Sequence, residues 1–165
     1  MIRPATSADA GAIAALWNGM IRDTLATFTT ELKTTQAIHQ TLNDRPGAFF
    51  VAEQAGAMLG FVTFGPFRGG PGYAATCEHS IIVAPDAQGQ GAGRALMARA
   101  IEAARRMDQH IMIAAISSAN PDAVEFHAKQ GFDHVGHLPQ VGRKSGQWLD
   151  LILMQKNLSH SAKMT

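Results

Sequence analysis

The chain has 165 residues, 46% of them hydrophobic, with 14 Lys and Arg against 13 Asp and Glu for a formal net charge of +1. This length and apolar content are typical of one globular domain and exclude intrinsic disorder. The balanced charge argues against nucleic acid as the main ligand. A single cysteine, Cys77, excludes an internal disulfide framework and a multi-cysteine zinc site. Because there is no apolar run of about 18 residues and no apolar signal core at the start, we expect a cytoplasmic protein without a membrane partner.

The first half of the chain predicts two helices and a strand hairpin. A short strand starts at Ile2, and Thr6 with Asp9 forms a capping box ahead of a helix. That helix is indicated by apolar residues at helical spacing, which are Ile13, Leu16, Trp17, Met20 and Ile21. A threonine-rich loop and a weaker helix at residues 35–43 come next. Two apolar segments at residues 48–53 and 58–64 then flank a turn and predict an antiparallel hairpin.

The middle of the chain predicts a strand–helix–strand unit. A glycine- and proline-rich loop over residues 65–72 precedes a long strand at residues 73–83. A helix is expected at residues 91–107, followed by a strand at residues 110–116 that is apolar throughout and therefore covered on both faces. The two strands should be parallel, with a right-handed connection.

The last part of the chain predicts one more helix and two more strands. Asn120 and Pro121 open the helix, as N-cap and first-turn residue, and Gly131 closes it. The strands lie near residues 132–137 and 148–155. Because neither repeats nor linkers are evident, we predict one α/β domain over residues 1–158 and a flexible tail at 159–165.

The most informative motif is the glycine-rich loop at residues 88–94, between a strand and a helix. Glycine lets backbone N–H groups approach an anion, and the helix N-terminus adds a positive dipole. A phosphate or pyrophosphate is therefore the expected ligand. The loop is not a P-loop, which would end in Gly-Lys-Ser/Thr, nor a dinucleotide fingerprint, because its third glycine comes one residue early.

Gln88, Gly91 and Gly93 instead form Gln-x-x-Gly-x-Gly, which resembles the acyl-CoA pyrophosphate loop of the GCN5-related N-acetyltransferases (GNAT). Other segments, in order, resemble the phosphinothricin and methionine sulfoximine N-acetyltransferase branch: residues 27–31, 65–68, 78–83, 120–132 and 146–150. The resemblance extends from Ile2 to Leu158. It implies an α/β (α+β) fold with a mixed central sheet, whose N-terminal half is antiparallel, a parallel β-α-β acyl-CoA unit, and helices on both faces. It also implies acetyl-CoA as co-substrate, no metal, and a homodimer with the substrate pocket near the interface.

Two residues are candidates for catalysis. Glu78 stands in an otherwise apolar strand, where a carboxylate is costly unless it has a task or a partner. Burial would raise its pKa toward neutrality, as suits a general base, and the alternative is a carboxylate satisfied by an arginine across the sheet. The resemblance favours the base, acting directly or through water. His127 lies at helical spacing with Val124, Ala128 and Gly131. It is either a buried, hydrogen-bonded histidine or, as the resemblance implies, a group that assists at the departing sulfur.

The resemblance also assigns the acyl-CoA contacts. Backbone groups of Ile81, Ile82 and Val83 would pair with the pantetheine arm, and a bulge there would aim an N–H at the thioester oxygen. Asn120 would add a contact near the sulfur besides capping its helix, and Lys129 either meets a cofactor phosphate or is solvated. The pyrophosphate would be held by Gln88, Gly89, Gln90, Gly91, Ala92, Gly93 and Arg94.

The acceptor site is predicted from four residues. Arg68, an isolated cation in the loop before the Glu78 strand, is either solvated or binds the carboxylate of an amino-acid substrate bidentately. Tyr73 could line the same pocket, and Phe28 and Glu31 could close it from the loop after the first helix.

These residues predict transfer of an acetyl group from acetyl-CoA to the α-amino group of a small amino acid or analogue, by direct attack in a ternary complex. Methionine sulfone, methionine sulfoximine and phosphinothricin are the favoured types. The alternatives are a polyamine, aminoglycoside or peptide N-terminus as acceptor, a non-catalytic acyl-CoA-binding module, or a phosphate-binding structural domain. A metal site is not expected, because His134 and His137 should lie on opposite faces of a strand.

Overall fold

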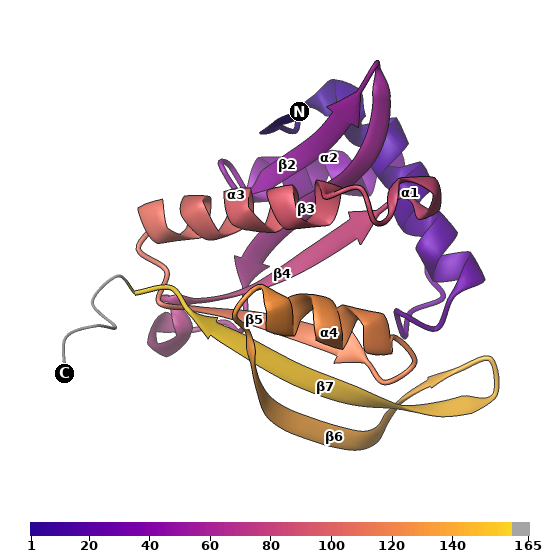
Figure 1. Ribbon diagram of the computed structural model, residues 1–165, viewed down its shortest axis with the longest axis vertical. Helices are drawn as coiled ribbons and strands as arrows, with labels where there is room; N and C mark the ends of the chain where they lie inside the picture. Colours follow the sequence, from indigo (N-terminus) through magenta and orange to yellow (C-terminus); the bar gives the residue numbers. More distant parts are fainter. Residues whose placement is uncertain (160–165) are drawn as a thin grey trace.

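Seven strands form one mixed sheet in the order β1-β2-β3-β4-β5-β7-β6, in which β4 and β5 are parallel and the other neighbours antiparallel (Figure 1). The computed structural model describes residues 1–159, so the tail predicted at 159–165 lies outside the described residues except for Ser159. The strands are β1 (Ile2–Pro4), β2 (Phe49–Gln54), β3 (Ala57–Pro66), β4 (Thr76–Val83), β5 (Ile111–Ser117), β6 (Asp133–Lys144) and β7 (Gln147–Asn157). The helices are α1 (Ala10–Asp23), α2 (Thr35–Asp44), α3 (Ala92–Arg106) and α4 (Pro121–Lys129). The expected mixed sheet with a parallel β4–α3–β5 unit is confirmed.

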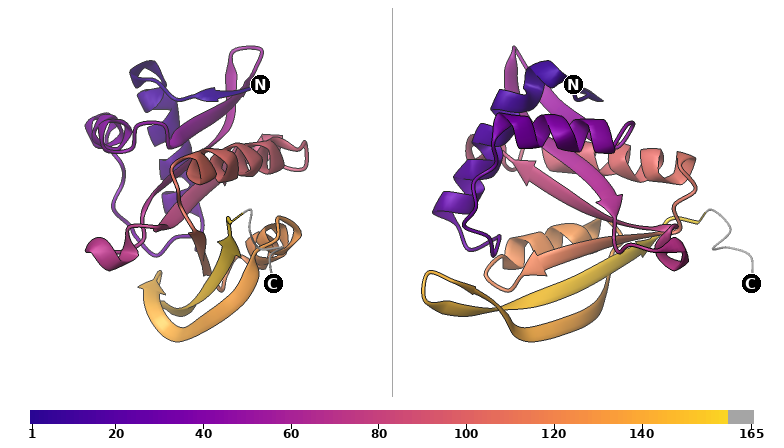
Figure 2. Two further views of the ribbon diagram at one scale, coloured as in Figure 1. Left: turned by 90° about the vertical axis from the view of Figure 1, so that its left-hand side faces the viewer. Right: turned by 180° about the vertical axis from the view of Figure 1, so that it is seen from behind.

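Helices cover both faces of the sheet (Figure 2). α1 and α2 pack on one face, over a core that includes Ile13, Ile38 and Phe61. α3 and α4 pack on the other, where the fully buried Leu96 and Met97 belong to a larger core. Because side chains alternate along a strand, each strand near the middle of the sheet contributes to both cores. Among the described residues, no helix is long and apolar enough to cross a membrane.

The strand before the glycine loop is shorter than predicted. It begins at Thr76 rather than at Tyr73, because residues Pro71–Tyr73 form a 3-10 turn. Pro71 has no N–H to offer a neighbouring strand, and Gly70 has a φ of +95°, so the chain turns there. Tyr73 therefore lies in the loop before β4, and the prediction that it begins the strand was wrong.

The C-terminal strands are longer than predicted and form a twisted hairpin at the edge of the sheet (Figure 1). The register of β6 against β7 shifts between His134 and Gly136 and again between Leu138 and Gly142. These irregularities accommodate Pro139, which a regular inner strand would not tolerate. The first shift also corrects a prediction. His134 and His137 pair with Met154 and Ile152, which are two apart on β7, so the histidines share a face.

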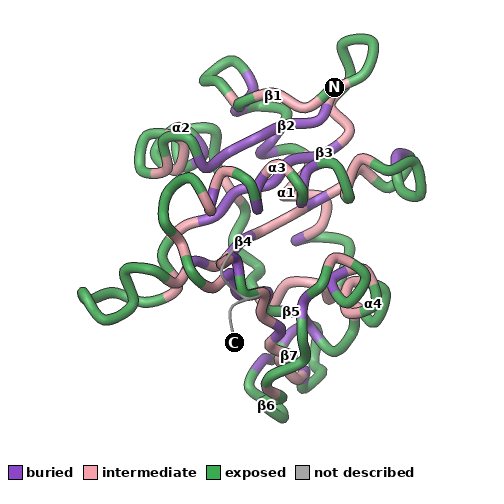
Figure 3. Tube along the Cα trace, turned by 60° about the vertical axis from the view of Figure 1, so that its left-hand side comes forward, coloured by how far each residue is buried: buried purple, intermediate pink, exposed green. Residues whose placement is uncertain are grey.

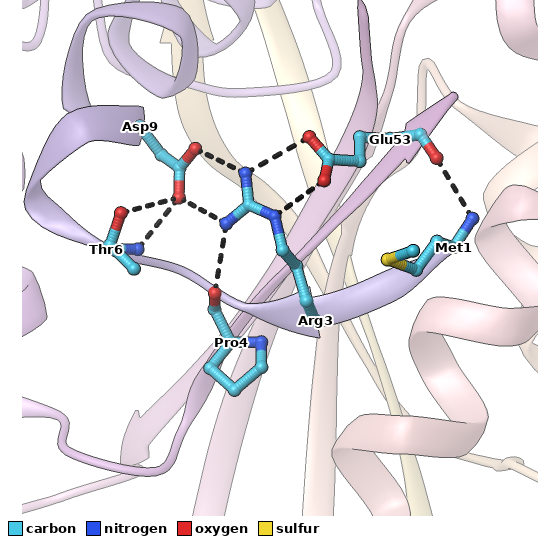
Figure 4. Close-up of polar contacts among 6 residues, drawn as sticks. All are labelled: Met1, Arg3, Pro4, Thr6, Asp9 and Glu53. Carbon is cyan, nitrogen blue, oxygen red and sulfur yellow. Dashed lines mark hydrogen bonds and ion pairs between the residues drawn. The ribbon is translucent and has the colours of Figure 1, made fainter. Parts of the chain in front are cut away.

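Arg3 clamps the start of the chain. Its guanidinium donates to both carboxylate oxygens of Asp9, each at 2.8 Å, and its Nε donates to Glu53 at 2.8 Å (Figure 4). Asp9 in turn accepts from the backbone N–H of Thr6 at 2.8 Å, which is one half of the predicted capping box. This network joins β1, the start of α1 and the end of β2. It also lowers the pKa of Asp9, chiefly through the hydrogen bonds from Arg3.

Candidate active site

The parallel strands β4 and β5 separate partway along their length. They pair at Thr76, Cys77 and Glu78, opposite Ile111, Met112 and Ile113, and no further pair follows. A cleft of about 150 Å³ lies where the strands part. It is lined by residues of both strands, α1, α4 and the loop after α1, including Trp17, Thr27, Glu78, His79, Ile81, Ser117, Asn120 and His127. The cleft therefore leaves backbone groups of the second half of β4 free to pair with an extended ligand.

Glu78 is the last paired residue before the strands part. It is half-buried, and its carboxylate makes no side-chain hydrogen bond or ion pair among the described residues. Burial raises its pKa, while the positive charge of Arg45 opposes that rise. The alternative role predicted for Glu78 was an ion pair with an arginine across the sheet. Arg45 does attract the carboxylate, but at a distance longer than that of an ion pair. An accessible carboxylate with a raised pKa is a stronger base than an ordinary carboxylate and can accept a proton from a bound substrate.

A pair of histidines forms the wall of the cleft on the side of α4. His127 is buried, as predicted for an inward-facing position, and its Nε2 lies 2.9 Å from Nε2 of His79. Nδ1 of His127 lies 2.7 Å from the carbonyl oxygen of Ala123. Burial lowers the pKa of both rings, that of His79 to about 3, and the proximity of His127 adds to the effect on His79. Both rings are therefore neutral at pH 7. His79 was not singled out from the sequence, where a histidine within an apolar strand has no distinguishing signal.

The glycine loop has the backbone geometry that an anion site requires. Gly89 and Gly91 have φ values of +78° and +88°, which other residues adopt with strain, and no atom lies within 4 Å of where either Cβ would be. α3 begins directly after Gly91, without a side-chain cap, so the N–H groups of its first turn remain available. Gly93 has a different environment: it faces Phe126 of α4 and Val83 of β4, and a Cβ there would lie 3.4 Å from each, at van der Waals contact.

A hollow of about 530 Å³ leads from the glycine loop toward the cleft. It is lined by Ile82, Val83 and Gln88 on one side and by α1 and residues 24–26 on the other, and Asn120 borders both it and the cleft. Asn120 also caps α4, since its Oδ1 accepts from the N–H of Ala123 at 3.3 Å. This shape fits an acyl-CoA whose pyrophosphate lies at the loop and whose pantetheine arm runs along β4. Lys129 borders neither space and forms an exposed ion pair with Glu125 at 3.2 Å. Gln90, Ala92 and Arg94 lie at the loop and the first turn of α3.

Of the predicted acceptor residues, the structure brings two together. Arg68 and Tyr73 line a cavity of about 390 Å³. Phe67 lies between them, with the guanidinium carbon of Arg68 at 5.7 Å and the ring of Tyr73 at 5.9 Å from its ring centre. Phe28 instead packs over Gly142 of β6, at a spot where a Cβ would be 2.5 Å from its ring. Glu31 is exposed in the loop after α1. Neither residue lines this cavity or the cleft, and their part in binding stays a prediction.

The loop between α1 and α2 is held over the cleft by contacts that the sequence did not indicate. Lys144 is buried, and its Nζ donates to the carbonyl oxygen of Thr27 at 2.9 Å. Ser117 Oγ donates to the carbonyl oxygen of Leu25 at 2.7 Å. The loop therefore depends on β6 and β5 for its position. Within the described residues, no cluster of three or more histidine, cysteine or acidic side chains is arranged to hold a metal ion, and His137 is engaged with Asp150 at 2.7 Å.

Comparison with known proteins places this arrangement in a family. The profile of the Acetyltransferase (GNAT) family matches residues 13–132. An L-methionine sulfoximine/L-methionine sulfone acetyltransferase of Salmonella typhimurium is 37% identical over 98% of this chain and 96% of its own. The crystal structure of a ribosomal-protein-alanine N-acetyltransferase from Brucella melitensis is 41% identical, with a TM-score of 0.91, covering 95% of this chain and 99% of the other. A phosphinothricin acetyltransferase from Sinorhizobium meliloti, solved with acetyl-CoA, is 27% identical with a TM-score of 0.93, covering 100% of this chain and 91% of the other.

The chain therefore belongs to the GNAT acetyltransferase family. Within that family it is similar to enzymes named for methionine sulfoximine, methionine sulfone and phosphinothricin.

Proposed function

We propose that the protein transfers the acetyl group of acetyl-CoA to the α-amino group of a small amino acid or analogue, of the methionine sulfone, methionine sulfoximine or phosphinothricin type. The observation that carries the proposal is the position of Glu78. It is an accessible carboxylate with a raised pKa at the point where β4 and β5 part, beside the space that fits a pantetheine arm. A module that only binds acyl-CoA has no need of such a carboxylate.

In the proposed reaction both substrates are bound together. Glu78 takes a proton from the substrate ammonium, directly or through water, and the freed nitrogen pair attacks the thioester carbonyl carbon. A C–N bond forms, the C–S bond breaks, and the sulfur leaves as thiolate. The nitrogen loses its second proton as the amide forms and the thiolate takes up one proton, so free CoA results while Glu78 releases its own proton to solvent. A backbone N–H among Ile81, Ile82 and Val83 would stabilise the negative charge on the carbonyl oxygen. Asn120 and His127 lie on the α4 side of the same cleft, where the sulfur would leave.

The acceptor would enter through the cavity that holds Arg68 and Tyr73. In this proposal the cationic cavity supplies the binding energy for an anionic or strongly polar amino acid, and orientation of its amine toward the thioester supplies much of the rate. Because a ribosomal-protein-alanine acetyltransferase is also similar to the chain, a peptide N-terminus is the second candidate acceptor. That acceptor has an amide where a free amino acid has its carboxylate, so the two candidates differ in charge next to the amine.

A screen of acceptors distinguishes these candidates. Thiol release from acetyl-CoA would be followed with methionine sulfone, methionine sulfoximine, phosphinothricin, a polyamine, an aminoglycoside and a peptide with N-terminal alanine. The proposal expects the highest kcat/KM with one of the first three. A higher value for the peptide, polyamine or aminoglycoside would replace the amino-acid acceptor. Acetyl-CoA binding without any turnover would favour the non-catalytic module.

The proposal includes a cytoplasmic homodimer. Support for the dimer comes from the β6–β7 hairpin, whose edge strand β6 is largely exposed (Figure 3) and which carries large exposed apolar side chains. Val141 and Trp148 are 55% and 59% exposed, and Val135 and Leu138 are exposed on the same hairpin. Large exposed apolar side chains such as these are typical of residues at an interface. Sedimentation at micromolar concentration tests it: a dimer that Trp148→Lys converts to a monomer is expected, whereas a monomeric wild type would contradict it.

A further inference from the structure

Arg45 is a half-buried arginine with few partners. It follows α2, where its backbone N–H donates to the carbonyl oxygen of Thr41. Its side chain makes one hydrogen bond among the described residues, from Nη1 to Oγ1 of Thr63 at 3.3 Å, and no ion pair. A guanidinium has five N–H donors, and leaving most of them unused in a half-buried place is unfavourable. Such a group is suited to receive an anion.

The guanidinium of Arg45 lies beside Glu78. Gly65 of β3 is the cross-strand partner of Glu78, and a Cβ on Gly65 would lie 2.6 Å from Nε and 2.8 Å from Cζ of Arg45. Arg45 thus occupies the space that a side chain at position 65 would fill, and cross-strand partners present their side chains on the same face. The attraction between Arg45 and Glu78 acts on the pKa of both residues, which is consistent with this proximity.

Arg45 also lines the acceptor cavity. It shares that lining with Arg68, Tyr73 and Gly65. The cavity has one acidic residue, Asp44, whose Oδ1 already accepts a hydrogen bond from Gln40 Nε2 at 2.8 Å. The lining of this cavity thus carries two arginines and one acidic group that is already hydrogen-bonded, and Glu78, which attracts Arg45, lies outside that lining and forms no ion pair with it. The excess of positive charge makes this a place for an anion.

We infer that Arg45 binds the α-carboxylate of the acceptor and is a specificity-determining residue of the site. The inference rests on the proposed function. In an α-amino acid the carboxylate carbon is two bonds from the amine nitrogen, so the group that holds the carboxylate must lie near the base that deprotonates the amine. Arg45 meets this condition, since its guanidinium fills the cross-strand position next to Glu78. Arg68, by contrast, is exposed near Phe67.

The test compares methionine sulfone with its α-carboxamide, which removes the negative charge next to the amine. Wild type is expected to prefer the acid. At a pH well above the raised pKa of Glu78, where the base stays ionised without Arg45, Arg45→Met should lower kcat/KM for the acid at least about tenfold, mainly through KM, and change the amide little. Arg45→Lys, which keeps the charge but not the planar fork, should fall between. Arg106→Gln is the matched control, because Arg106 is an exposed arginine of α3 paired with Glu102, and it should leave both substrates unaffected.

A second variant moves Arg45 without removing its charge. In Gly65→Ala the new methyl group would collide with the guanidinium, and the flexible end of Arg45 must shift. Because the φ of Gly65 is not positive, the backbone accepts alanine. This variant should raise KM for the acid and leave KM for the amide nearly unchanged. Unchanged affinity for acetyl-CoA by calorimetry shows in each variant that the fold is intact.

Two results would overturn the inference and leave the proposed function standing: Arg45→Met penalising acid and amide equally, or Gly65→Ala leaving KM for the acid unchanged. A wild type that uses amino acids but treats acid and amide alike would also overturn it. A wild type that acetylates only polyamines, aminoglycosides or peptides would overturn the proposed function, and the inference with it.

Discussion

The Nε2 atoms of His79 and His127 lie 2.9 Å apart, which requires one hydrogen between them. Nδ1 of His127 faces the Ala123 carbonyl at 2.7 Å, so it carries a hydrogen and donates it. In the neutral ring, Nε2 of His127 is then an acceptor, and His79 is the donor. Both nitrogens of His127 are thus engaged by protein groups. For His127 to protonate a thiolate, as the resemblance implied, one of these two hydrogen bonds must first break.

We expect the histidine pair to stay neutral across the working range of pH. Burial lowers the pKa of both rings, that of His79 to about 3, so His79 stays neutral as the pH falls from 8 to 5, and His127 takes up a proton only at a lower pH than an unperturbed imidazole. In the unfolded chain both would be protonated below about pH 6.5, so they cost stability as the pH drops through that value. NMR titration of the imidazole signals measures this directly. Signals of His79 or His127 that titrate near pH 6.5 would contradict the neutral pair.

Glu78→Gln should remove the proton-accepting carboxylate while keeping the size and shape of the side chain. We expect kcat to fall by about 10²–10⁴-fold. In the wild type, activity requires the carboxylate ionised, so the rate is lost as the pH falls through its raised pKa. That acidic limb should be absent from the residual activity of the variant. Near-normal turnover with the limb retained would mean that Glu78 is structural.

Gly91→Val should weaken acetyl-CoA binding at least about tenfold by calorimetry, which is about 1.4 kcal/mol. The valine side chain would enter the open space above the loop, where the phosphates are expected to approach the backbone. Gly56→Val is the matched control. Gly56 has a φ of +80° with nothing near its Cβ, so it brings the same backbone strain in the β2–β3 turn, away from the loop. Equal affinities for acetyl-CoA in the two variants would mean that the glycine loop is not part of the acetyl-CoA binding site.

Arg3→Met should lower the melting temperature of the protein. It should also make the melting temperature fall less steeply as the pH is lowered. Asp9 has a lowered pKa in the folded protein, so its pairing with Arg3 stabilises the fold at neutral pH, and this is lost as the pH falls through that value. The difference between wild type and variant should therefore be larger at pH 7 than below about pH 3. Arg106→Gln, which removes an exposed ion pair, should change little. A constant difference at both pH values would exclude an electrostatic role for the clamp.

The elements with strong local signals were predicted well. The helix expected at residues 91–107 spans Ala92–Arg106, and the glycines before it have the positive φ values that an anion loop needs. The last strands were predicted too short, because Pro139 and two glycines interrupt the alternation on which strand prediction depends. Arg45 was not singled out from the sequence. Its position over Gly65 is set by the packing of α2 on β3, which no local pattern encodes.

Glu78 is expected to drive acetyl transfer to the amine of an amino acid. Mass spectrometry of the products formed from acetyl-CoA and methionine sulfone, sulfoximine or phosphinothricin tests it most directly. We predict an N-acetylated amino acid and free CoA in equal amounts with the wild type, and at most a small fraction of both with Glu78→Gln at the same acetyl-CoA occupancy. No acetylated product from any of the three, or equal yields from the two proteins, would contradict this role of Glu78.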